Sequence, residues 1–196
     1  MVPTRNHPHA AVPTKVTLSG YSIAVTETTK RQWDAVREWA ASRGCLELPA
    51  GEGKKPDEPV RHVTWHQALI WCNAASERKG LTPPYRVKGE VYRIGNPDDV
   101  ECDWKAYGYG LYNMTGNALE WCWDWYGSYA SGSGMHGELC VDPNVHPAVR
   151  GSRVLRGGDR SKEATYARVA YRHSSFPGRS SPNIGFRVAR SDAATP

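Results

Sequence analysis

Residues 153–190 read RVLRGGDRSKEATYARVAYRHSSFPGRSSPNIGFRVAR, and this stretch begins and ends like the core of a packed β-sheet. The pieces RVLRGG, ARVAYR and GFRVAR combine β-branched and aromatic residues with arginines, which is typical of β-strands. We therefore predict three strands, with these residues at the buried positions: Val154, Val169, Tyr171, Phe186 and Val188. The runs between the strands, DRSKEATY and HSSFPGRSSPN, lack apolar periodicity and should lie at the surface.

The composition indicates one globular domain. The chain has 196 residues, 39% of them hydrophobic, with 8 Trp and 10 Tyr, which suits one folded core better than a disordered segment. No apolar run approaches the roughly 20 residues that span a bilayer. The start, MVPTRNHPHAAVPTK, lacks the apolar stretch of a signal peptide. We therefore expect no membrane segment and a chain that is cytoplasmic as synthesised, with its final site of display left open.

The cysteines and histidines give no clear metal site. The five cysteines are Cys45, Cys72, Cys102, Cys122 and Cys140. They form no CxxC pair and are odd in number, which favours reduced thiols over disulfides, with zinc ligation as the alternative. His62 and His66 are four residues apart, but Thr64 and Gln67 indicate that a helix begins between them. The two histidines should therefore not share one helical face.

Positive charge is concentrated near the C-terminus. Residues 150–190 contain ten Arg or Lys and two acidic residues, a net charge of +8, whereas the rest of the chain carries −3. This asymmetry suggests an anionic partner, with nucleic acid as one candidate. The alternative is structural, because arginines between apolar strand residues often pair inside the fold.

Two helices are predicted from capping signals. Thr29 with Gln32 and Thr64 with Gln67 have capping-box spacing, and helical apolar periodicity follows each pair. Gly44 and Gly80 stand where the two helices should stop. A strand region is predicted before the first helix, in KVTLSGYSIAVTE.

The middle of the chain is less regular. Residues 85–109 predict a loop with one hairpin. In GYGLYNMTGNALEWCWDWYG, an extended backbone would place Trp121, Trp123 and Trp125 on one face. Such a row indicates a buried core face, and a stacking platform for nucleic acid is the alternative. The run GSYASGSGMHGE that follows predicts an exposed loop.

Four motifs in a fixed order carry a family resemblance. They are PVRHVTWHQALIWCNAASERKGLTPPY, GYGLYNMTGNALEW, RVLRGG and NIGFRV. Together they resemble the formylglycine-generating (sulfatase-modifying) enzyme domain over about residues 14–190. The resemblance implies an α+β C-type lectin-like fold of the formylglycine-generating enzyme subtype: two helices, small twisted antiparallel sheets and much irregular backbone. Residues 1–13 would form a flexible N-terminal segment and 191–196 a tail.

The chain departs from the catalytic pattern of that family. The resemblance implies copper held by two cysteines shortly after the GG, but here Lys162 lies near the first position and residues 164–167 surround the second. No cysteine follows Cys140, so the thiolate ligands that Cu(I) favours are missing. We therefore expect no enzyme and no cofactor, with a formylglycine-generating-type oxidoreductase as the alternative.

The resemblance also implies a calcium site near GNALEW, with Glu120 as the matching carboxylate. Calcium needs only hard oxygen ligands, which Glu120 and nearby carbonyls would supply. The alternative is a structural carboxylate bonded to backbone amides.

Residues 153–187 resemble the variable region of diversity-generating retroelement target proteins, which display mutable residues for ligand binding on a C-type lectin fold. That resemblance implies a non-enzymatic recognition protein. The aromatic and charged residues of the region suit an unidentified protein, peptide or other surface ligand better than nucleic acid. The implied ligand-binding residues are Asp159, Arg160, Ser161, Lys162, Glu163, Thr165, Tyr166, His173, Ser174, Ser175 and Phe176. The sugar-binding triplets EPN and QPD of calcium-dependent lectins are absent.

Overall fold

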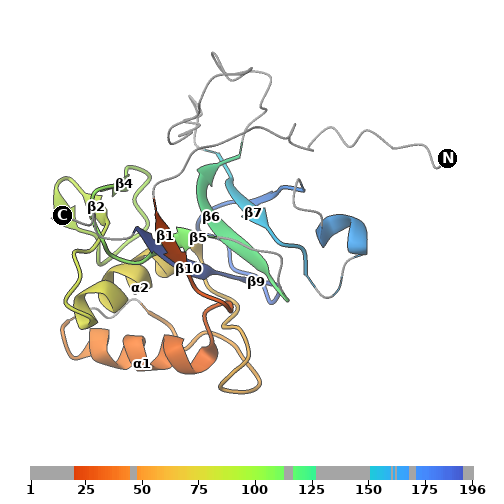
Figure 1. Ribbon diagram of the computed structural model, residues 1–196, viewed down its shortest axis with the longest axis horizontal. Helices are drawn as coiled ribbons and strands as arrows, with labels where there is room; N and C mark the ends of the chain where they lie inside the picture. The colour runs from red at the N-terminus through yellow and green to blue at the C-terminus, as the bar shows by residue number, and fades with distance from the viewer. Residues whose placement is uncertain are drawn as a thin grey trace, which may run out of the picture.

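Two helices pack on one side of three small β-sheets, with α2 between α1 and the sheets (Figure 1). The computed structural model describes residues 20–44, 48–112, 117–126, 151–159, 161, 163–167 and 171–191. The elements in chain order are β1 (Tyr21–Ile23), α1 (Lys30–Ala41), α2 (Trp65–Arg78), β2 (Tyr85–Val87), β3 (Glu90–Val91), β4 (Glu101–Cys102), β5 (Gly110–Tyr112), β6 (Leu119–Trp125), β7 (Arg153–Arg156), the 3-10 helix η1 (Ala164–Ala167), β8 (His173–Ser175), β9 (Ile184–Gly185) and β10 (Arg187–Ser191).

The strands form three sheets in the described part of the chain. Their orders are β1-β10-β5, β3-β2-β4 and β8-β7-β6-β9. All pairs are antiparallel except β6 with β9, which are parallel. Strands from the two ends of the chain meet in the first sheet, where Tyr21 lies opposite Ser191. The fold is therefore mixed α+β, as the sequence predicts.

Both helices begin at the predicted capping boxes. Thr29 and Thr64 accept hydrogen bonds from the backbone N–H groups of Gln32 and Gln67, whose side chains bond back to the cap N–H groups. Each box satisfies two N–H groups that have no partner within the helix. His62 lies before α2 with φ 61°, whereas His66 is buried inside the helix, so the two are separated as expected.

Neither α1 nor α2, within the described chain, is long and apolar enough to cross a membrane.

The core joins the helices through stacked aromatic rings. Trp33 of α1 and Trp71 of α2 have parallel rings with centroids 6.2 Å apart, and Phe186 packs edge-on against both. Trp33 and Phe186 are fully buried. Because each ring removes a large apolar area from water, this cluster supplies much of the force that holds the helices on the sheets.

The predicted row of three indoles is only partly correct. Trp121 is fully buried, but Trp123 and Trp125 are half-buried. The pairing of β6 with β7 shifts register between Trp121 and Trp125, and such an irregularity breaks the strict alternation of a strand. Trp123 stacks on Tyr85 with ring centroids 5.1 Å apart.

Two other predictions for strands need correction. The strand predicted over 167–172 is wrong in its described part: Ala167 ends η1, Tyr171 and Arg172 are not in a strand, and the strand begins at His173. Its backbone pairs with β7, and this non-local pairing outweighs the polar character of its side chains. The hairpin predicted within 85–109 is present as β2 and β3, but β4 adds a third strand.

Buried arginines explain part of the basic C-terminal third. Arg153 is 2% exposed, and its guanidinium lies 3.8 Å from the ring centre of Trp65 and 3.4 Å from that of Trp125. Arg172 and Arg187 are also buried. These three arginines lie inside the fold, in agreement with the alternative that part of the C-terminal positive charge is structural.

A buried ion pair connects two of the sheets. Arg187 of β10 donates from Nη2 to Oε1 of Glu120 in β6 over 2.9 Å, and its Nε lies 3.2 Å from the same oxygen. Its Nη1 donates to the carbonyls of Ala24 and Val25 at 2.9 and 2.6 Å. The side chains of the pair are 5% and 0% exposed.

We predict that Arg187→Met destabilises the fold by about 3–5 kcal/mol, because it leaves the Glu120 carboxylate buried without its partner. The double variant Glu120→Leu with Arg187→Met should recover much of that loss. Urea unfolding measures both. Arg31→Met is the control, since Arg31 and Asp57 form a pair with side chains 67% and 80% exposed, and it should change stability by at most about 0.5 kcal/mol. Equal losses in the two single variants would contradict the prediction.

A buried histidine makes stability depend on pH. Burial, aided by the charge of Arg153, lowers the pKa of His66 from 6.5 to about 4, and its Nδ1 lies 3.1 Å from the Tyr92 hydroxyl. In this window the unfolded chain binds a proton that the folded chain does not, so His66 is fully stabilising above pH 6.5 and loses this contribution as the pH falls towards 4.

We predict that stability depends less steeply on pH in His66→Gln than in the parent protein between pH 6.5 and 4. His66 contributes up to about 1.4 kcal/mol per pH unit to the slope in this window. Urea unfolding of both proteins between pH 7.5 and 4.5 measures it. The other titrating groups contribute to both curves, so their difference isolates His66. Parallel curves would show that His66 is not the cause.

Candidate functional site

A double-glycine turn begins the candidate site at the end of β7. Gly157 and Gly158 have φ of 94° and 69°, a region that residues with a side chain rarely adopt. A Cβ on Gly158 would lie 3.1 Å from backbone atoms of Ala167 and Tyr166. The turn therefore lets η1 pack directly against the strand end, and this contact positions the loop between them.

Asp159 follows the turn and holds the start of the loop. Its side chain is buried, and Oδ1 accepts from the N–H of Ser161 at 2.8 Å and from the Ser161 hydroxyl. The Asn183 side chain donates to the same hydroxyl over 3.3 Å. Oδ2 of Asp159 is also buried and makes no hydrogen bond within the described chain. Asp159 and Ser161 are thus linked to the loop before β9 through Asn183.

Aromatic side chains gather beside this loop. The ring of Tyr166 packs edge-on against Tyr171 with centroids 5.0 Å apart, and the Arg172 guanidinium lies 5.1 Å from the ring centre of Tyr126. Desolvation, with the neighbouring Tyr166 and Tyr126, raises the pKa of Tyr171. These rings remain partly exposed, so they can supply apolar contact area and hydroxyl groups to a ligand.

Four residues of this arrangement are not predicted by the sequence. They are Tyr126, Tyr171, Arg172 and Asn183. The strand predicted over residues 167–172 places Tyr171 in the core, whereas its ring is half-buried. Tyr126 lies far away in sequence, at the end of β6, and no local pattern points to it.

The third part of the site is β8 and the turn after it. β8 is an edge strand among the described strands. Its residues pair with buried residues of β7; Ser174, for example, lies opposite Val154. Phe176 follows and is 64% exposed. The next carbonyl, of Pro177, accepts from the first N–H of α2 at Trp65 over 3.0 Å. The exposed ring therefore stands on a turn that is anchored to the core.

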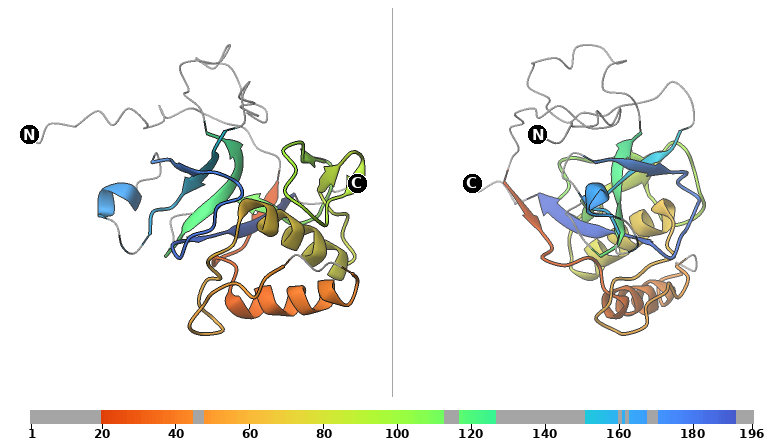
Figure 2. Two further views of the ribbon diagram at one scale, coloured as in Figure 1. Left: turned by 180° about the vertical axis from the view of Figure 1, so that it is seen from behind. Right: turned by 90° about the vertical axis from the view of Figure 1, so that its right-hand side faces the viewer.

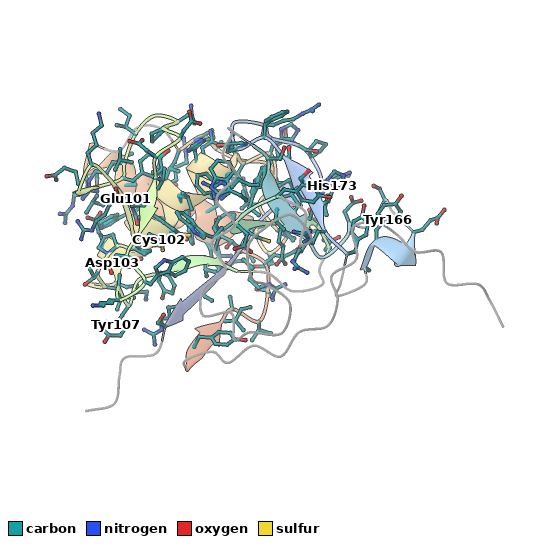
Figure 3. All side chains as sticks on the ribbon, turned by 90° about the horizontal axis from the view of Figure 1, so that it is seen from above. Glu101, Cys102, Asp103, Tyr107, Tyr166 and His173 are labelled. Atoms are coloured by element: carbon teal, nitrogen blue, oxygen red, sulfur yellow. The ribbon has the colours of Figure 1, made fainter. Side chains whose placement is uncertain are left out.

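The predicted ligand-binding residues are distributed as follows. Ser161, Glu163, His173 and Phe176 are exposed, Tyr166, Ser174 and Ser175 are half-buried, and Asp159 is buried. Arg160 and Lys162 lie outside the described residues, as does the side chain of Thr165. Tyr166 and His173 lie near one another at one end of the molecule (Figure 3), and η1 is far from β2 and β4 in the left-hand view of Figure 2.

The described residues do not form a metal centre. They contain no group of three or more His, Cys, Asp or Glu side chains that could hold an ion. The Glu120 carboxylate accepts hydrogen bonds from Arg187 instead, so it is a structural carboxylate bonded to a guanidinium. Calcium at Glu120 stays a prediction from the family resemblance.

The comparison with known families decides the identity of the domain. Residues 4–103 and 102–192 match the model of the sulfatase-modifying factor enzyme 1-like domain. The chain belongs to this family. The sulfatase-modifying factor relatives include a formylglycine-generating enzyme of Streptomyces coelicolor, which is 30% identical over 80% of this chain and 60% of its own length. A serine/threonine-protein kinase, pkn1, of Chlamydia pneumoniae is 42% identical over 75% of this chain and 26% of its own length. The chain thus spans three fifths or less of these two curated relatives.

Solved structures confirm the C-type lectin-like α+β fold. Treponema denticola variable protein 1 matches with a TM-score of 0.72 and 25% identity, over 96% of this chain and 90% of that one. The structure of CarF matches with a TM-score of 0.66 and 20% identity, over 88% and 87% of the two chains. The four ordered motifs predicted a sulfatase-modifying domain similar to a variable protein, and both parts of this prediction are confirmed.

We predict that Gly158→Ala destabilises the protein by more than about 1 kcal/mol, because its φ is positive and its Cβ would contact Ala167. Gly178→Ala is the matched control: it lies in the turn after Phe176, and a Cβ there meets nothing within 4 Å. The control should be neutral or slightly stabilising. Thermal unfolding of the two variants gives the comparison, and similar midpoints would show that the close approach to η1 does not matter.

Proposed function

We propose that this protein is a non-enzymatic ligand-binding protein that displays variable surface residues on a C-type lectin-like scaffold, as a diversity-generating retroelement target does. One observation carries the proposal. The residues that form the scaffold are buried, as Val154, Leu155 and Phe186 show, whereas the segments between them present exposed polar and aromatic side chains. Changes at such surface positions have small effects on stability, so the scaffold tolerates them.

The chemistry of the surface supports a protein or peptide as the ligand. Tyr126, Tyr166 and Tyr171 combine apolar area with hydroxyl groups at a low entropic cost, and Ser161 and His173 add adaptable polar contacts. Phe176 provides an exposed anchor. Nucleic acid is a weaker candidate because Arg153, Arg172 and Arg187 of the basic third are buried. The similarity to a Treponema variable protein adds support from the whole chain.

The alternative is a formylglycine-generating-type oxidoreductase, which the Streptomyces relative favours. Against it, the two positions where the family holds copper fall near Lys162 and within residues 164–167, and none of these is a cysteine. Cu(I) sites depend on soft thiolate or thioether ligands. Incubation with copper and a cysteine-containing sulfatase peptide separates the two functions, with the Streptomyces enzyme as positive control. Conversion of the peptide to the formylglycine product would overturn the proposal.

We predict that a pool randomised at Ser161, Tyr166, His173, Ser174 and Phe176 keeps its fold in most members. A pool randomised at Val154, Leu155, Ile184 and Phe186 should lose it in most, because substitutions in a packed core typically cost about 2–5 kcal/mol. Yeast display with protease challenge measures both pools. Selection on an arbitrary protein target should then enrich binders from the surface pool alone. Equal loss of folded members would contradict the surface assignment.

The DNA around the gene provides an independent test. The proposal expects a second copy of the codons for residues 153–187 that differs only opposite adenines, with a reverse transcriptase gene beside it. The absence of any such copy would remove diversification from the proposal.

A further inference from the structure

A hollow, here termed the aromatic groove, lies between β4 and the C-terminal end of β10. Its volume is about 110 Å³, and the residues that matter for its chemistry are Tyr21, Tyr85, Trp104, Trp123, Asp103 and Arg190. Cys102 and Asp103 lie at the end of the molecule opposite Tyr166 and His173 (Figure 3). The groove is therefore separate from the candidate ligand-binding surface.

The groove is built from packed rings. Trp123 stacks on Tyr85 at 5.1 Å, and Trp104 meets Trp123 edge-on with centroids 6.0 Å apart. Gly110 completes the wall, where a Cβ would lie 3.1 Å from the Tyr85 hydroxyl. That hydroxyl accepts from the N–H of Leu111 over 2.9 Å. A ligand would thus meet a preformed surface and would not have to order it.

Three aromatic side chains at or beside the groove are exposed to solvent. Trp104 is 47% exposed, Tyr21 43% and Tyr107 41%. Trp104 is the only tryptophan among the exposed large hydrophobic residues of the described chain. Exposed large apolar groups that gather in one place mark interaction sites more often than single ones do.

The charge beside Trp104 is negative. Residues 98–105 contain four acidic residues, Asp98, Asp99, Glu101 and Asp103, and one basic residue, Lys105, which gives a net charge of −3. Within the described chain, Glu101 and Asp103 form no ion pair. Oδ1 of Asp103 accepts a hydrogen bond from the backbone N–H of Lys105 over 3.0 Å. The opposite wall carries one cation, Arg190. The Trp104 side of the groove is therefore complementary to a positive charge.

The protein already stacks guanidinium groups on indole rings elsewhere. Arg153 lies between Trp65 and Trp125, and Arg43 lies 5.2 Å from the ring centre of Trp39. The planar guanidinium suits this geometry and can bond to a carboxylate at the same time. Trp104, with Asp103 next to it, offers both contacts, and no arginine of the described chain covers its ring.

We propose that the aromatic groove binds an arginine side chain of an extended basic segment from a partner protein. The guanidinium stacks on Trp104 and donates hydrogen bonds to Asp103, while Glu101 adds attraction. Arg190 on the opposite wall repels the same charge and so fixes the side of the groove on which it binds. This second site does not depend on the function proposed for the surface around Tyr166.

The test uses a dye-labelled heptapeptide, Gly-Ser-Arg-Gly-Arg-Ser-Gly, blocked at both ends, and fluorescence anisotropy at low salt with the full chain. The matched peptide has Gln in place of both Arg. We expect the arginine peptide to bind at least about fivefold more tightly, and Trp104→Ala or Asp103→Asn to weaken it about three- to tenfold. Arg190→Gln should instead strengthen binding about two- to fivefold, because it removes a like charge.

Two controls make the outcome decisive. Asp57→Asn removes one negative charge outside the groove and should leave the affinity unchanged. A loss equal to that of Asp103→Asn would reduce the binding to overall charge and overturn the proposal. Shifts in the same direction for Asp103→Asn and Arg190→Gln would also overturn it. Tighter binding after Arg5→Gln with Lys15→Gln would overturn the assignment to a partner, since it would identify the chain's own N-terminal segment as the occupant.

Discussion

The buried ion pair between Glu120 and Arg187 is the contact on which the arrangement of the sheets depends. It joins β6, the strand that carries the indoles, to β10, the strand that pairs with β1. The Arg187 guanidinium also holds the carbonyls of Ala24 and Val25. An ion pair buried away from water destabilises a fold unless its carboxylate oxygens and guanidinium nitrogens all make well-oriented hydrogen bonds. The pair thus selects one orientation of β6 relative to β10, which apolar packing alone would leave less precisely defined.

The arginines show how the same residue type serves different parts of the molecule. Inside the fold, Arg153 lies between indole rings, and Arg187 neutralises a carboxylate. A basic C-terminal third is therefore compatible with a surface that is not strongly basic. The charge of a segment therefore indicates the kind of partner it binds only when the buried arginines are left out of the count.

Local signals made the helices predictable. The boxes at Thr29 and Thr64 involve residues three positions apart, and nothing distant is needed to form them. The strand at His173 escaped prediction because its pairing with β7, not its own side chains, determines it. In the candidate site, the exposed polar runs could be located from sequence, but the burial of Asp159 depends on Ser161 and Asn183. The contact between Tyr126 and Arg172 is likewise tertiary.

The double glycine at the end of β7 has a consequence for inheritance. Gly157 and Gly158 have positive φ, and a Cβ at Gly158 would make tight contacts of 3.1 Å with the backbone of η1. All glycine codons begin with two guanines. A mutational process that acts at adenines would change at most their silent third base, so the most constrained turn of the scaffold would be protected by its own codons while neighbouring positions diversify.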